Sequence, residues 1–133
     1  MRNWPLVGLL AVCGALLACG KAAGPATPDL PASVSPGWKR TSFSQSNAPE
    51  EIPKGGMPEC WQANYAGAGT ARIWLCRYNA ETSAFDAAQR ARAGAQTVKF
   101  QEGEYLVLVQ WNNAPKADLT ALVRTVQKTI GRK

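Results

Sequence analysis

Cysteine thiols are the side chains of this sequence that can take part in the widest range of chemistry. There are four cysteines and no histidine. A cysteine sulfur can carry a lipid, join a disulfide, exchange with a dithiol or ligate a metal. The lack of histidine removes Ser-His-Asp and Cys-His catalytic pairs, histidine metal sites and histidine general bases. The residues around each cysteine therefore indicate which of these roles it has.

Cys19 follows a segment with the layout of an export signal. Arg2 supplies a basic start, residues 6–18 are apolar, and Ala18 is a small residue directly before the cysteine. A secretory signal combines these parts around an apolar region of about 7–15 residues. A membrane-spanning helix needs about 20. An ordinary cleaved signal and an uncleaved membrane segment are the alternatives, and Cys13, which follows Val12, fits a cleavage site poorly.

The motif Leu16-Leu17-Ala18-Cys19 resembles the lipobox of bacterial lipoprotein precursors. This resemblance implies that residues 1–18 are a signal peptide and that Cys19 becomes the first mature residue. It also implies a diacylglycerol thioether on the sulfur and an acyl chain such as palmitate on the amino group. Several lipid chains hold a protein firmly on a membrane. We therefore expect a cell-envelope protein, and Gly20 implies the periplasmic side of the outer membrane if the cell is diderm.

Cys60 and Cys76 are brought together by a predicted β-hairpin. Residues 60–66 and 70–78 are rich in aromatic and β-branched residues, and the glycine-containing segment 67–69 joins them. A turn centred on Ala68 places Cys60 opposite Cys76 and puts Trp61, Ala63 and Tyr65 on one core face. Directly opposite Cβ atoms lie about 4.5–5.5 Å apart. An exported address favours a structural disulfide, while a redox or metal-binding pair is the alternative.

The mature chain divides into a spacer and one small domain. Residues 19–37 hold the lipidated cysteine and a proline-rich tether that extends to about 50 Å at about 3.1 Å per residue. Residues 38–133 form a single domain, in which residues 38–43 are a candidate strand and residues 44–59 a long loop. Removing Arg2 with the signal lowers the formal net charge from +6 to +5.

The middle of the domain predicts a helix followed by a second hairpin. Residues 79–93 read as a helix with a capping box at residues 83–86, an apolar stripe of Phe85, Ala88 and Ala91, and a stop at Gly94. Residues 96–111 read as the hairpin. A two-residue turn at residues 102–103 would pair Phe100 with Tyr105, and the return strand is apolar on both faces, as in a central strand.

The C-terminal segment predicts an amphipathic helix. Residues 112–115 offer an asparagine cap and a proline suited to the first turn. Gly131 would end the helix. The buried stripe has helical spacing and consists of Leu119, Leu122, Val123, Val126 and Ile130.

These elements, in the order β-β-β-α-β-β-α, predict an α+β two-layer domain. We expect an antiparallel sheet of four to five strands with two helices packed on one face. The strand at residues 72–78, with Ala84 and Phe85 at the start of the next helix, loosely resembles uncharacterised bacterial envelope domains. That resemblance implies no function.

The leading functional hypothesis is a membrane-anchored, non-enzymatic accessory or binding module. Trp74 is a candidate contact residue. Arg124, Lys128 and Arg132 recur along one helix face and suggest binding of anionic lipid or cell-wall polymer, although a solvated face whose cations suit the helix C-terminus is the favoured explanation. No cofactor, metal or nucleic-acid partner is expected. A histidine-free hydrolase would depend on carboxylates near the long loop, namely Glu50, Glu51 and Glu59.

Overall fold

The computed structural model describes residues 27–35 and 37–131. Residues 1–18, Cys19 and Arg132 therefore lie outside the described residues. The fold is α+β, a six-stranded antiparallel sheet curled into a half-barrel with two helices. The strand order is β1-β2-β3-β4-β6-β5. Along the chain the elements are β1 (Ser33–Val34), β2 (Trp38–Ser46), β3 (Glu59–Ala66), β4 (Thr70–Arg77), α2 (Glu81–Arg90), β5 (Thr97–Glu102), β6 (Tyr105–Asn112) and α3 (Lys116–Gly131).

The β3–β4 hairpin has the predicted register. Trp61 pairs with Leu75, Ala63 with Ile73, and Cys60 with Cys76. The two cysteines form a disulfide, and their Cα atoms are 4.1 Å apart. The predicted pairing of these cysteines is therefore confirmed.

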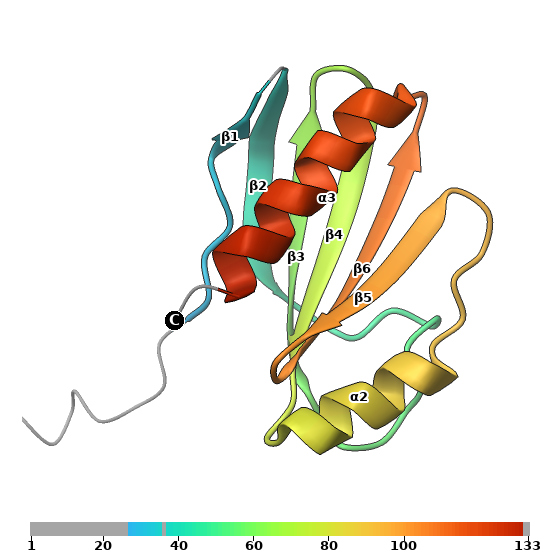
Figure 1. Ribbon diagram of the computed structural model, residues 1–133. Helices are drawn as coiled ribbons and strands as arrows, with labels where there is room; N and C mark the ends of the chain where they lie inside the picture. Colours follow the sequence, from blue (N-terminus) through green and yellow to red (C-terminus); the bar gives the residue numbers. More distant parts are fainter. Residues whose placement is uncertain (1–26, 36, 132–133) are drawn as a thin grey trace, which may run out of the picture.

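The two helices pack on opposite faces of the sheet, so the expectation that they share one face is wrong. Leu75 and Val107 belong to a buried cluster with α3 residues, whereas their chain neighbours Cys76 and Leu106 belong to a second cluster with α2 residues. Successive strand side chains point to opposite faces. The face opposite α3 is also apolar over its lower half, so a second helix is required to shield it from water. Figure 1 shows α3 lying across the sheet and α2 at its lower end.

The α3 helix buries the predicted stripe. Leu122, Val126 and Ile130 are buried, and Leu119 and Val123 pack against the same cluster. The indole Nε1 of Trp38 donates a hydrogen bond of 2.9 Å to the carbonyl oxygen of Asp118. The first turn of α3 is thus tied to the start of β2.

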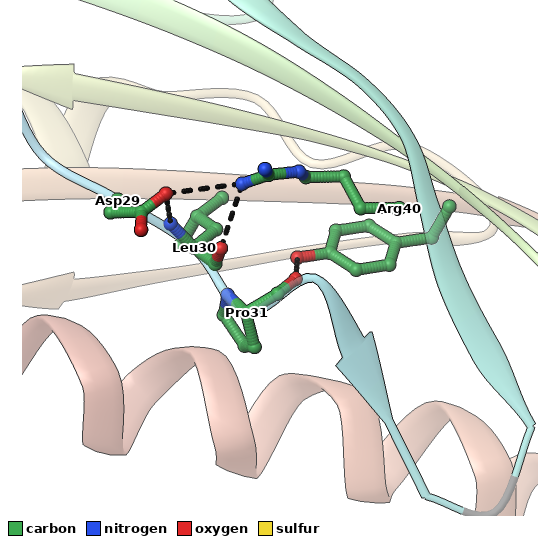
Figure 2. Close-up of polar contacts among 5 residues, drawn as sticks. Asp29, Leu30, Pro31 and Arg40 are labelled. Atoms are coloured by element: carbon green, nitrogen blue, oxygen red, sulfur yellow. Dashed lines mark hydrogen bonds and ion pairs between the residues drawn. The ribbon is translucent and has the colours of Figure 1, made fainter.

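Part of the predicted spacer belongs to the folded core. Leu30 and Val34 are only 2% and 5% exposed, and residues 33–34 pair with β2 as β1. Figure 2 shows how polar contacts of Asp29, Leu30, Pro31 and Arg40 hold this segment to the sheet. β1 is the strand that extends the observed order to β-β-β-β-α-β-β-α. The spacer prediction failed here because the buried apolar residues are isolated among prolines, without a repeating pattern.

The turn of the β5–β6 hairpin lies one residue later than predicted, which shifts the strand pairing by two residues. Phe100 pairs with Val107 rather than Tyr105, and Glu102 pairs with Tyr105. Gly103, at φ 59°, stands first in the turn. A positive φ at that position suits glycine in a two-residue hairpin. Because the shift is two residues, every side chain keeps its predicted face, and β6 is central as predicted.

The α2 helix differs from the prediction in its bounds and in its buried face. Ala80 occupies its N-cap position without a side-chain hydrogen bond, so the predicted capping box does not form. Phe85 is 55% exposed and does not belong to the buried stripe. The buried face consists of small residues, which let the helix approach the sheet closely: Ala84, Ala87, Ala88 and, just beyond the helix, Ala91.

The side chain of Lys99, from β5, caps the C-terminal end of α2. Its Nζ donates hydrogen bonds of 2.6 Å and 2.8 Å to the carbonyl oxygens of Ala88 and Ala91. The last carbonyls of a helix have no partner within the helix, and a cation there also complements the helix dipole. The loop at residues 47–58 covers the same region, because Ile52 is buried in the α2 cluster.

Within residues 27–35 and 37–131, no helix is long and apolar enough to cross a membrane.

Candidate binding site

The face of the sheet that α2 covers changes from apolar to polar along the strands. At its lower end the disulfide and Leu106 lie under α2. Four residues further along these strands, on the same face, polar side chains form a row across the sheet. From β2 to β5 this row consists of Ser42, Asn64, Arg72, Gln110 and Thr97.

A hollow of about 610 Å³ opens over this polar row. Its lining includes residues that flank the β3–β4 turn, and this turn lies at the end of the sheet away from α2 (Figure 1). Strands β2, β3, β4 and β6 contribute to it, together with the segment before β5. Its lining residues are Thr41, Asn64, Tyr65, Ala66, Thr70, Ala71, Arg72, Ala95, Gln96, Gln110, Trp111 and Asn112.

Arg72 is the one charged residue among these lining residues. It is exposed, and it makes no ion pair within the described part of the chain. Its guanidinium carbon lies 5.7 Å from the ring centroid of Trp74. A guanidinium over an aromatic face is attracted by the ring and can still use its N–H groups for an anion.

Trp74 supports Arg72 from the sheet. It is 9% exposed, so its ring has little surface left for a ligand to stack on. Trp74 was predicted as a candidate contact residue, and the guanidinium group of Arg72 lies over its ring.

Asn64 is held in place by its neighbours. Its Nδ2 donates a hydrogen bond of 2.8 Å to Ser42 Oγ. Thr41 Oγ1 donates to the backbone oxygen of Asn64 at 3.2 Å. By contrast, the side chains of Gln96 and Gln110 have no hydrogen-bond partner among the described residues. The hollow therefore contains one amide that the protein holds in place, that of Asn64, and two amides available for a ligand, those of Gln96 and Gln110.

Gly69 allows the rim of the hollow to close. A Cβ atom built on Gly69 would lie 2.6 Å from the carbonyl oxygen of Asn112 and 2.5 Å from that of Asn113. Real Cβ atoms do not approach backbone this closely, so the β3–β4 turn can meet the end of β6 only with glycine there. Thr70 and Asn112 are thereby paired at the rim.

A second hollow, of about 540 Å³, lies between the C-terminal half of α3 and the β5–β6 turn. Gln127 Nε2 donates to Glu102 Oε1 at 3.3 Å across it. We call this feature the basic groove, because Arg124 and Lys128 are exposed beside the single carboxylate. Its lining residues are Glu102, Arg124, Gln127, Lys128 and Gly131.

The two predicted basic residues that the structure describes therefore lie together in the basic groove. Arg124 and Lys128 line it, while Arg132 lies outside the described residues. The groove also contains Glu102, which the sequence pattern of the helix alone does not reveal.

The three candidate carboxylates do not meet in either hollow. Glu59 Oε1 accepts a hydrogen bond of 2.7 Å from Arg77 Nη2. This bond raises the pKa of Arg77 above its usual value. Glu50 is exposed in the long loop, and the backbone oxygen of Glu51 accepts from the Arg92 N–H at 2.8 Å.

Sequence reasoning missed the hollow around Arg72. The available signal was the predicted turn centred on Ala68, because that turn places Asn64 opposite Arg72, as observed. Gln110 joins them only because β4 pairs with β6 across the intervening α2 and β5. No local pattern encodes that long-range pairing.

Over the described ranges, no group of three or more Cys, Asp or Glu residues is arranged to hold a metal ion. Comparisons with protein-family models, curated proteins and solved structures find no match to this chain. The two hollows are therefore the features of the described chain whose chemistry bears on function.

Proposed function

We propose that this protein is a lipid-anchored binding module of the bacterial cell envelope. In this proposal the hollow around Arg72 holds a carboxylate of a cell-wall fragment or peptide. The lipobox motif at residues 16–19 supports the anchor. The main support for binding is the guanidinium group of Arg72. It has no ion-pair partner among the described residues, and the other residues that line its hollow are uncharged.

The lining groups favour a particular ligand chemistry. Arg72 can bind a carboxylate through two parallel N–H···O bonds. The amides of Gln96 and Gln110 and the hydroxyl of Thr70 supply donors and acceptors around it. A carboxylate next to amide or hydroxyl groups matches this set. Peptide C-termini and the stem peptides of peptidoglycan have that composition.

The site is tested by a titration followed by nuclear magnetic resonance. The mature lipidated protein in detergent micelles is titrated with a soluble peptidoglycan stem peptide that ends in a free carboxylate. We expect the Arg72 Nε–H and the side-chain amides of Asn64 and Gln110 to shift. The same peptide with an amidated C-terminus is the matched control and should cause much smaller shifts. Equal responses to both peptides, or shifts confined to α3, would contradict the proposal.

The anchor has a separate test. A Cys19→Ala variant should lose metabolic palmitate label and leave the membrane fraction, because the thioether-linked lipid has no other attachment point at the start of the mature chain. A Cys13→Ala variant is the control, since residue 13 would leave with the signal. Membrane retention and label that persist in Cys19→Ala would contradict the anchor.

A further inference from the structure

The described chain begins at the same end of the molecule where α3 ends. In Figure 1 the blue start of the chain and the red C-terminal end of α3 lie at the lower left. Leu30 and Ile130 belong to one buried cluster, and β1 contacts α3. The chain therefore leaves the fold beside the end of α3 that carries the basic groove.

Polar contacts fix this starting segment to the sheet. Asp29 Oδ1 accepts hydrogen bonds from the Leu30 N–H at 2.9 Å and from Arg40 Nη1 at 3.1 Å. Arg40 Nη1 also donates to the carbonyl oxygen of Leu30 at 2.8 Å (Figure 2). The Tyr65 hydroxyl donates to the carbonyl oxygen of Pro31 at 2.6 Å. The chain is thus held from Asp29 onward.

This attachment shortens the link between the fold and the anchor. Asp29 lies ten positions after Cys19, a separation of at most about 35 Å when fully extended. The spacer expected from residues 21–37 would have reached about 50 Å. A protein anchored at Cys19 therefore keeps its lower end within reach of the lipid surface.

The exposed basic side chains of α3 are suited to that surface. Arg124 and Lys128 are exposed in the basic groove, and two further basic residues, Arg132 and Lys133, follow α3 in the sequence. The loop at residues 47–58 and α2 also lie at the lower end in Figure 1. They carry the side chains of Met57 and Phe85, which are 93% and 55% exposed.

We propose that the C-terminal half of α3, with Arg124 and Lys128 in the basic groove, docks on an anionic lipid bilayer. Docking would point the Arg72 hollow away from the membrane, because Ala66 and Thr70 of its lining flank the β3–β4 turn. Figure 1 shows that turn at the other end of the sheet. Each Lys or Arg brought close to an anionic leaflet contributes roughly a fivefold gain in binding. The inference depends on the lipid anchor of the proposed function and adds a defined orientation to it.

The test uses the mature lipidated protein in vesicles that contain lipids with spin-labelled head groups. A fluorophore is placed near the groove by Gln127→Cys, or at the other end of α3 by Ala117→Cys. We expect quenching at position 127 in vesicles with about 30% phosphatidylglycerol, and little in pure phosphatidylcholine, because the groove is basic. Position 117 should stay unquenched in both. Equal quenching at the two positions, or no effect of anionic lipid, would overturn the proposal.

Charge reversal provides the matched comparison. Arg124→Glu with Lys128→Glu should lower the ratio of docked to undocked protein by at least about 25-fold, from the two fivefold contributions. Lys39→Glu with Lys116→Glu makes the same change in net charge at the other end and should leave quenching intact. Both variants should still float with vesicles, because the lipid is unchanged.

The remaining outcomes are also decisive. Unchanged quenching in Arg124→Glu/Lys128→Glu would overturn the docking surface. Sedimentation with peptidoglycan that needs Arg124 and Lys128, without lipid quenching, would assign the surface to the polymer and overturn the lipid proposal. Protein that fails to float with any vesicle would instead contradict the anchor on which the inference depends.

Discussion

The hydroxyl of Tyr65 donates a hydrogen bond of 2.6 Å to the carbonyl oxygen of Pro31, 34 positions earlier in the chain. Tyr65 is 1% exposed and belongs to the cluster that also buries Leu30 and Val34. A segment that reads as a linker is thereby made part of the core. This bond and those of Arg40 determine where the fold begins.

The first prediction concerns Tyr65→Phe. This change removes the donor and leaves the Pro31 carbonyl oxygen without it, so we expect a loss of about 0.5–1.5 kcal/mol in the free energy of unfolding at neutral pH. Urea unfolding followed by tryptophan fluorescence measures the change. A variant as stable as the parent protein would show that the bond does not hold the segment.

The second prediction is the pH dependence of the same variant. Burial raises the pKa of Tyr65 from 10.0 to about 12, and the nearby Arg40 charge opposes part of this rise. The stabilising effect of the neutral phenol is therefore complete below about pH 10 and is lost as pH rises toward about 12. Two pKa units correspond to about 2–3 kcal/mol.

Unfolding measured between pH 9 and pH 12 should consequently show a shallower loss of stability in Tyr65→Phe than in the parent. Burial also raises the pKa of Tyr78, so some alkaline dependence should remain in the variant. Identical pH profiles for the two proteins would contradict the assignment to Tyr65.

The third prediction concerns the disulfide between Cys60 and Cys76. Their positions are 16 apart, and closing a loop of this size stabilises by about 3 kcal/mol in the chain-entropy model. Replacing both cysteines by alanine should lower the unfolding free energy by at least that amount. A reducing agent should lower the stability of the parent similarly but leave the double variant unchanged. Free thiols in the denatured, unreduced parent would contradict the disulfide.

The fourth prediction concerns Lys99, which bonds the carbonyl oxygens at the end of α2. Lys99→Met keeps the aliphatic length but removes the cation, and we expect a loss of about 1.5–3 kcal/mol. Hydrogen exchange should speed up in α2 more than in α3. Lys116→Met, at an exposed position in the first turn of α3, is the control and should change little. Unaltered exchange in α2 would contradict this role of Lys99.

The fifth prediction follows from the exposure of Phe85. Because Phe85 is 55% exposed, Phe85→Ser should change stability by less than about 0.5 kcal/mol. Ala87→Ser, on the buried face of the same helix, is the comparison and should cost more. A larger loss of unfolding free energy in Phe85→Ser would contradict this and support the predicted apolar stripe that includes Phe85.

The sequence was sufficient where the pattern is local. A glycine-containing turn centred on Ala68 determines every pair of the β3–β4 hairpin, including that of the cysteines. Helical spacing alone identifies the buried residues of α3. Both patterns require only the period of one element and the geometry of one turn.

Other features depend on tertiary contacts that no local pattern carries. Phe85 looked like a core residue, but α2 packs through its alanines, because close contact with the sheet favours small side chains. The β1 segment has only isolated apolar residues, which are buried because α3 and β2 surround them. The hollow around Arg72 requires the pairing of β4 with β6, strands that are separated along the chain by α2 and β5.

The most direct test of the central claim is a cycle of four binding measurements by calorimetry. It pairs the parent protein and Arg72→Gln with the carboxylate stem peptide and its C-terminal amide. Arg92→Gln, an exposed arginine outside the hollow, serves as the control and should bind like the parent.

We expect either single change to weaken binding by roughly 10-fold to 100-fold, as for loss of a charged hydrogen bond. The second change should then add little, because both remove the same interaction. Full affinity of Arg72→Gln for the carboxylate peptide, or equal affinity of the parent for both peptides, would contradict the assignment of Arg72 as the carboxylate-binding residue.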